Sequence, residues 1–235
     1  SGYKDDKLYS IKPTSGDGDF TFSRDGSGAS PATRVNSAGL IEKGRTNLLL
    51  QSNSFGTTWT NNNSTETSGQ SGYDGTNDAW LLNSVGSGSA YATQSVSSSG
   101  VKTLSVYAKA GTADWVIVQM AGGTASYTWF DLTNGLIGTE VNVIESKIES
   151  VGGGWYRCSI TGANSNTSVN IYVATANNST STSSGDNIYI QDAQLEKGLV
   201  ATSYIETTTA AASAGILGDM PRLDYSGGAT CPSLL

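Results

Sequence analysis

Apolar and polar residues alternate along most of the chain, a pattern that predicts strands. In segment 101–109, Leu104, Val106 and Ala108 occupy one phase and Tyr107 the other, and side chains two residues apart point to the same face of a strand. The same period, bounded by Gly, Asn and Ser, predicts strands at about 46–52, 78–83, 89–97, 101–109, 114–120, 125–132, 139–149, 154–161, 167–175 and 186–195.

A helical period is missing from these segments. The best helical candidate is 141–150, but Val141, Val143 and Ile148 do not keep one helical face, so we interpret it as a strand plus a turn. Near the N-terminus, 17–24 and 32–41 have the composition of two short strands joined by a Gly/Ser/Pro loop. The pattern therefore predicts an all-β protein, an antiparallel β-sandwich with a short N-terminal β connector.

The alternation also divides each strand into a core face and an outward face. The residues assigned to the core are Leu104, Val106, Ala108, Val116, Val118, Met120, Phe130, Leu132, Tyr156, Cys158, Ile160, Val169, Ile171 and Val173. The outward set combines aromatic rings with hydrogen-bonding side chains: Tyr107, Trp115, Tyr127, Trp129 and Tyr172, with Gln119, Asp131, Arg157 and Asn170. Rings that stack on an apolar sugar face, next to groups that bond its hydroxyls, predict carbohydrate binding. The alternative is packing, because a second subunit or the N-terminal hairpin could cover the same rings.

The charge of the chain argues against some partners. Its net charge is −7, only 14% of its residues are charged, and no basic cluster is present, which disfavours nucleic acid and anionic membranes. No apolar run is long enough to span a membrane. Cys158 and Cys231 occur in contexts so different that we expect two free thiols.

Catalytic patterns are weak. Histidine is absent, which removes the commonest general base. The nearby carboxylates of Glu140, Glu145 and Glu149 are more typical of a solvated strand edge than of a glycosidase pair. We therefore expect a protein that is not an enzyme.

Three stretches carry a family resemblance: Arg45 to Trp59, Gly152 to Thr161 with its Gly-Gly-Trp-Tyr-Arg run, and Ala193 to Ile205 with Ala-Gln-Leu-Glu followed by Ala-Thr-Ser-Tyr-Ile. They resemble the carbohydrate-binding-module-like jelly rolls of bacteriophage tail and appendage proteins, which are similar to carbohydrate-binding module families 4, 9, 16 and 22. The resemblance implies a jelly roll over 45–207, a connector hairpin over 1–44 and a C-terminal linker over 208–235. It also implies a virion location, in a phage tail or appendage, or otherwise an extracellular one, and a homo-oligomer formed through virion assembly.

The resemblance further implies a structural Ca²⁺ that joins the opening loop to the closing strand. The matching positions are Asn53 and Asp192, and their oxygen ligands suit this ion. Gly56 stands where related modules often carry an acidic residue, so one ligand is missing. An ordinary hydrogen-bonded role for Asp192 is the alternative.

Three functions stay open on the sequence. The first is a non-catalytic module that binds a polysaccharide or oligosaccharide weakly and in many copies. The second is a purely structural virion module whose faces pack against other subunits. The third is an ancillary binding module of a polysaccharide-degrading enzyme.

Overall fold

The computed structural model describes residues 44–214 in full and, outside that range, only the backbones of six short strands. The chain divides into two compact units, one of residues Thr46–Ala212 and another made of Ser1–Arg45 and Ser213–Leu235. The expected strand at 17–24 and Cys231 lie outside the described residues.

The second unit contains paired short strands. β1 (Gly2–Lys4) pairs with β2 (Lys7–Tyr9), β3 (Thr33–Val35) with β4 (Ile41–Lys43), and β19 (Leu223–Asp224) with β20 (Ser233–Leu234). β5 (Arg45–Asn47) pairs with β18 (Ala212–Ala214) where the chain enters and leaves the larger unit. The segment expected to be one strand at 32–41 is thus divided between β3 and β4, which form a hairpin.

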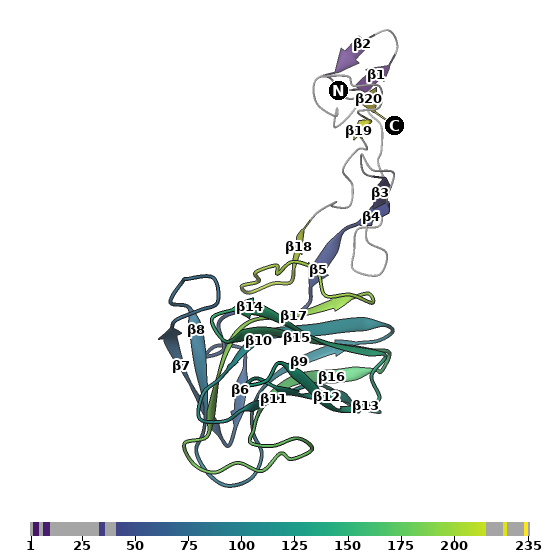
Figure 1. Ribbon diagram of the computed structural model, residues 1–235. Coiled ribbons are helices and arrows are strands. Elements are labelled where there is room, and N and C mark those ends of the chain that lie inside the picture. The colour runs from purple at the N-terminus through teal and green to yellow at the C-terminus, as the bar shows by residue number, and fades with distance from the viewer. Residues whose placement is uncertain are drawn as a thin grey trace. The chain divides into compact units, whose positions relative to one another are not determined.

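The larger unit is a sandwich of two six-stranded antiparallel sheets (Figure 1). We name each sheet after a central strand. The β10 sheet has the order β14 (Glu145–Gly152), β15 (Trp155–Gly162), β10 (Lys102–Ala110), β17 (Asn187–Lys197), β8 (Ala79–Ser84) and β7 (Ser64–Gln70). The β11 sheet has the order β13 (Leu136–Val141), β12 (Ser126–Asp131), β11 (Trp115–Ala121), β16 (Asn166–Ala174), β9 (Ala90–Ser98) and β6 (Thr60–Asn62).

The strand order is that of a jelly roll. Within the sandwich, β15-β10-β17-β8 faces β12-β11-β16-β9, so chain neighbours such as β10 and β11 lie in different sheets. This arrangement confirms the predicted fold class. No helix in the described part of the chain is long and apolar enough to cross a membrane.

The core lies between the sheets and contains the predicted inward residues. Leu104 and Val106 from β10 and Val116 and Val118 from β11 are fully buried in one cluster that also contains Phe130. Burial of this apolar surface is the main favourable term in folding. The phase assignment for β10, β11, β12, β15 and β16 is therefore confirmed.

A bulge changes the phase of β17. Ser105 pairs with Gln194 and Tyr107 with Gln191, so β17 carries one residue more than β10 between these pairs. Asp192 sits in the bulge with a φ of 52°, a conformation that Asp tolerates better than most residues. Beyond the bulge, Ala193 and Leu195 enter the core.

Candidate functional site

The outer face of the β11 sheet brings together most of the predicted site residues. Across the sheet, Ile117 lies between Trp129 and Tyr172, and Gln119 lies between Tyr127 and Asn170. Trp115 and Asp131 form the next pair along the same face. Directly paired residues in neighbouring strands share a face, so β11, β12 and β16 present their aromatic and amide side chains on one surface.

Polar side chains on this face form a connected network. The Asn170 Nδ2 donates to Gln119 Oε1 at 2.7 Å, the Tyr172 hydroxyl donates to the same oxygen at 3.1 Å, and the Thr93 hydroxyl donates to Asn170 Oδ1 at 2.5 Å. Burial raises the pKa of Tyr172, so its hydroxyl stays protonated and can donate. Both lone-pair directions of Gln119 Oε1 are occupied, while its Nε2 finds no acceptor within the described residues. That amide is a free donor at the surface of the sheet.

Four aromatic rings on this face are half-buried: Trp115, Tyr127, Tyr172 and Tyr91. Tyr91 and Tyr172 are in tilted contact with ring centroids 4.4 Å apart, and they pair directly across β9 and β16. Trp115 is fixed by close packing, because a Cβ at Gly138 would lie only 2.6 Å from its ring. The rings are thus held in place by neighbours while part of each one contacts solvent.

Tyr91 was missed on the sequence, although a signal for it exists. Ala90 and Ala92 are buried in the core, and the same alternation places Tyr91 and Thr93 on the opposite face of β9. The period that separates the faces of the neighbouring strands separates the faces of this strand as well.

Trp129 and Asp131 lie on the predicted face but are covered. The Trp129 side chain is 5% exposed, and its indole N–H donates to the Ser179 carbonyl at 2.9 Å. Asp131 Oδ1 accepts the backbone N–H groups of Thr133 and Asn134, both at 2.9 Å. Burial raises the pKa of this carboxyl, but the hydrogen bonds from Asn134 and Thr133 outweigh it and leave the pKa below its usual value. Asp131 therefore caps the turn after β12, and Trp129 packs under a loop.

Tyr107 and Arg157 belong to the predicted outward set but not to this face, because their strands lie in the other sheet, and this separates them from the rest of the predicted site. They pair with each other in the β10 sheet. Their side chains lie on the outer face of that sheet, on the opposite side of the sandwich from the β11 face. Tyr107 is 8% exposed because the Tyr73 ring stacks on it at 3.9 Å. The Arg157 guanidinium lies 5.4 Å from the Tyr107 ring centroid and donates to Ser105 Oγ at 3.1 Å and to the Thr202 carbonyl at 2.5 Å. Both residues hold the C-terminal segment 198–208 and the loop before β8 on the β10 sheet.

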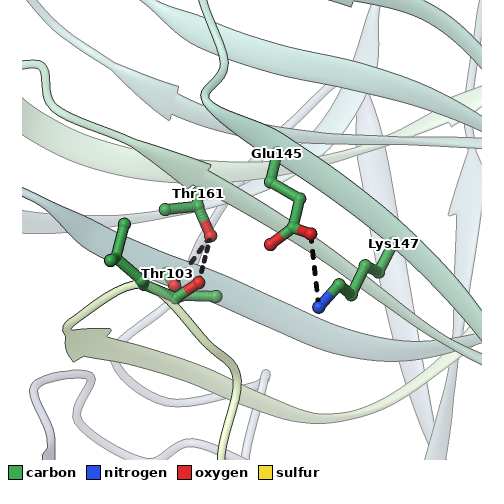
Figure 2. A network of polar contacts seen from close by, with 5 residues as sticks. Thr103, Glu145, Lys147 and Thr161 are labelled. Carbon is green, nitrogen blue, oxygen red and sulfur yellow. Dashed lines mark hydrogen bonds and ion pairs between the residues drawn. The ribbon is translucent and has the colours of Figure 1, made fainter.

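The carboxylates considered for sugar cleavage lie on or beside edge strands. Glu140 is in β13, and Glu145 and Glu149 are in β14. Glu145 forms an ion pair with Lys147 at 3.3 Å on the outer face of the β10 sheet, beside the Thr103 and Thr161 hydroxyls (Figure 2). Cys158 is a free thiol inside the core, where burial raises its pKa. A buried neutral thiol of this kind is unreactive.

Asn53 and Asp192, the predicted calcium ligands, lie together. Asn53 Oδ1 accepts the Asp192 backbone N–H at 3.2 Å, and Asp192 Oδ2 accepts the Tyr73 hydroxyl at 2.8 Å. A Ca²⁺ ion would have to share these oxygens with donors of the chain itself. Within the described residues no group of three or more His, Cys, Asp or Glu side chains could hold a metal. The calcium site stays a prediction.

Asp192 gives a testable pH dependence. Burial raises the pKa of its carboxyl from 3.8 to about 6, and the carboxylates of Asp78 and Asp74 add to the rise against the Tyr73 hydrogen bond. The folded chain thus holds a proton that the unfolded chain releases, so this contribution to stability is complete below about pH 4 and is lost as the pH rises through about 6. We expect Asp192→Asn, which tolerates the same backbone, to be more stable than the parent at about pH 8 by on the order of 1–3 kcal/mol and to unfold at a higher temperature.

Melting curves at several pH values, run in a chelator, check this expectation. The difference between the two proteins should shrink toward pH 4, and equal melting temperatures at every pH would contradict it. Adding Ca²⁺ near pH 8 separates the metal hypothesis from the hydrogen-bonded one. If the ion binds at Asp192 it raises the melting temperature of the parent but not of Asp192→Asn.

Comparison with known proteins finds a likeness at the level of solved structures. No protein-family model matches the chain. No curated protein sequence matches it either. A solved carbohydrate-binding module, TmCBM61 in complex with β-1,4-galactotriose, matches with a TM-score of 0.41 and 14% identity over 65% of this chain and 99% of that one.

Proposed function

We propose that this protein binds an oligosaccharide or polysaccharide, without cleaving it, on the outer face of the β11 sheet. One observation carries the proposal: Trp115, Tyr127, Tyr91 and Tyr172 hold partly exposed rings on one sheet face, around the free amide donor of Gln119. The apolar face of a pyranose can stack on such rings while its hydroxyls bond the amides.

Binding at this face should be weak for each site. The rings are half-buried rather than enclosed, so a sugar would lose only part of its hydration and gain only part of the available contact. Weak sites become effective when many copies act together. We therefore place the protein in a multivalent setting, and the resemblance of its sequence to phage tail and appendage modules supports a virion as that setting.

Trp115→Ala tests the proposal most directly. We expect this change to weaken binding of a neutral oligosaccharide by about tenfold or more, since an aromatic anchor at a binding site is worth roughly 1–3 kcal/mol. A screen of neutral polysaccharides selects the ligand, and calorimetric titration then measures its affinity for the parent and the variant.

Tyr156→Phe serves as the matched control for that titration. Tyr156 is an aromatic residue of β15 in the other sheet, packed against the core, so this variant should bind the sugar as tightly as the parent does. Equal binding by the parent and Trp115→Ala would remove the β11 face from the proposal.

A structural virion module is the second candidate, and one observation favours it. Apolar side chains are exposed at the edge formed by β13 and β14: Leu136 is 58% exposed, Ile144 55% and Ile137 41%. Edge strands with exposed apolar side chains are suited to pairing with another copy. Sedimentation at several concentrations separates the sugar-binding candidate from the packing candidate. A packing module should self-associate, and the double variant Leu136→Lys/Ile144→Lys should not.

A further inference from the structure

The β10 sheet carries a groove on its own outer face, on the opposite side of the sandwich from the aromatic face described above. Its volume is about 590 Å³, and its lining comes from the end of β7, from β8 and β17, and from β10 with the turn after it. A volume of this size lies within the range of about 300–1,000 Å³ that small-ligand sites occupy. The lining residues used below are Gln70, Leu81, Lys109 and Tyr189.

Lys109 is the only cationic side chain in the lining. It pairs with Trp155 on one neighbouring strand and with Tyr189 on the other, so the lysine stem lies between two aromatic residues on the sheet face. Within residues 44–214 its ammonium has no hydrogen-bond or ion-pair partner. Other lysines of the sandwich differ: Lys147 pairs with Glu145 at 3.3 Å (Figure 2), and the Lys102 ammonium donates to the Gly100 carbonyl at 3.2 Å.

The rest of the groove offers an apolar surface and further polar groups. Tyr189 packs against the cluster of Ala79, Tyr107 and Trp155, which holds its ring in place. Its hydroxyl has no partner among the described residues. Tyr189 also pairs with Leu81 on β8, so an aromatic and an aliphatic side chain lie next to each other beside the ammonium. Gln70 Nε2 donates to the Ser68 carbonyl at 3.2 Å, which leaves its Oε1 as an acceptor.

We infer that this groove is a second binding site, specific for a uronic acid, a pyranose that carries one carboxylate. The ring of such a sugar stacks on Tyr189 and Leu81, its carboxylate accepts from Lys109, and its hydroxyls meet the Tyr189 hydroxyl and Gln70. A single ammonium suits a single carboxylate, whereas phosphate recognition usually uses several donors or a planar guanidinium. The net charge of −7 does not forbid this contact, because solvent ions screen charges more than about 8 Å apart at physiological salt.

The experiment compares trigalacturonate with its fully methyl-esterified form, which keeps the shape of the ligand and removes its charge. The proteins are the parent, Lys109→Gln and, as a matched control, Lys147→Gln, which loses one positive charge from the same sheet where Glu145 already pairs with it. We expect the parent and Lys147→Gln to prefer the acid form. In Lys109→Gln, affinity for the acid should fall by about tenfold or more, the scale of a hydrogen bond to a charged group.

Chemical-shift mapping on the parent locates the site and keeps this inference separate from the proposed function. Trigalacturonate should shift the amides of Lys109 and Tyr189, and the Trp115 indole signal reports on the β11 face. Shifts at Trp115 without shifts at Tyr189 would overturn the inference that the groove binds the sugar, and would leave the proposed binding at the β11 face standing. Equal affinity for acid and ester, or equal losses in the two lysine variants, would overturn it as well. Melting curves of all three proteins confirm that each one is folded.

Discussion

Asn47→Ala should lower the free energy of unfolding by about 3–5 kcal/mol, because it removes four buried hydrogen bonds at once. The Asn47 side chain is fully buried. Its Nδ2 donates to the carbonyls of Ala193 and Ile205 at 3.1 and 2.9 Å, and its Oδ1 accepts the N–H groups of Leu49 and Leu195, both at 3.1 Å. One amide therefore joins the start of the sandwich to its last strand and to the C-terminal segment.

Chemical denaturation of the parent and the variant measures this loss. Asn61→Ala is the matched control, since Asn61 is an exposed asparagine of β6 and its loss should change stability by less than about 0.5 kcal/mol. An unfolding free energy for Asn47→Ala within about 1 kcal/mol of the parent would show that the surrounding backbone groups find other partners. Asn47→Asp refines the result, because aspartate keeps the acceptor and loses both donations.

The inward faces of the strands were predictable because a period of two is all that the prediction requires. Val169 and Ile171 in β16 alternate with polar or aromatic neighbours, Val116 and Val118 in β11 lie on either side of the outward-facing Ile117, and all four are buried in the core. Alternation also separated the outward side from the core side in β10, β11, β12, β15 and β16, but not beyond the bulge in β17. It carries no information about which sheet a strand joins. Since β10 and β11 follow each other in the chain but lie in different sheets, Tyr107 and Trp115 face opposite sides of the molecule.

Other differences between the predicted and the observed strands have local causes. β6 and β7 were missed because their sequences, Thr60–Asn62 and Ser64–Gln70, contain no apolar residue, and both lie at sheet edges where burial does not select one. The single strand expected at 139–149 is two strands, β13 and β14, separated at Asn142, which has a φ of 52°. Such a conformation interrupts a strand, and Asn is a residue that accepts it.

The groove beside Lys109 could not have been found from the sequence. Gln70, Leu81, Lys109 and Tyr189 come from four strands, and the chain order places only two of them, β7 and β8, side by side; β10 and β17 join them through long connections. The β10–β11 turn approaches β17 so closely that a Cβ at Gly111 would lie 2.6 Å from the Asn187 carbonyl oxygen. Contacts of this kind depend on the jelly-roll crossing of strands and leave no periodic signal.

Trp129→Ala should destabilise the fold by about 3–5 kcal/mol, the usual cost of removing a large buried ring. The outward phase of this residue suggests a binding role, but Trp129 is 5% exposed and packs with Ile117 and Ala174 in a cluster of its own on the outer side of the β11 sheet. Its ring meets Tyr127 edge to face at 5.3 Å, and its indole N–H donates to the Ser179 carbonyl at 2.9 Å. The ring therefore supports both the rings beside it and the loop above it.

Trp129→Phe and Trp115→Ala divide these contributions. Trp129→Phe keeps an aromatic ring and loses the bond to Ser179, so we expect it to cost about 1–2 kcal/mol of stability. Trp115→Ala should weaken neutral sugar binding and change stability far less than Trp129→Ala, because Trp115 is only half-buried. Denaturation curves and sugar titrations on all three variants test this division. If Trp129→Ala were as stable as the parent and bound sugar more weakly, the ring would contact the ligand directly, and the covering loop would have to open. A loss of stability instead assigns Trp129 to the support of Tyr127, whose partly exposed ring is left to meet the sugar.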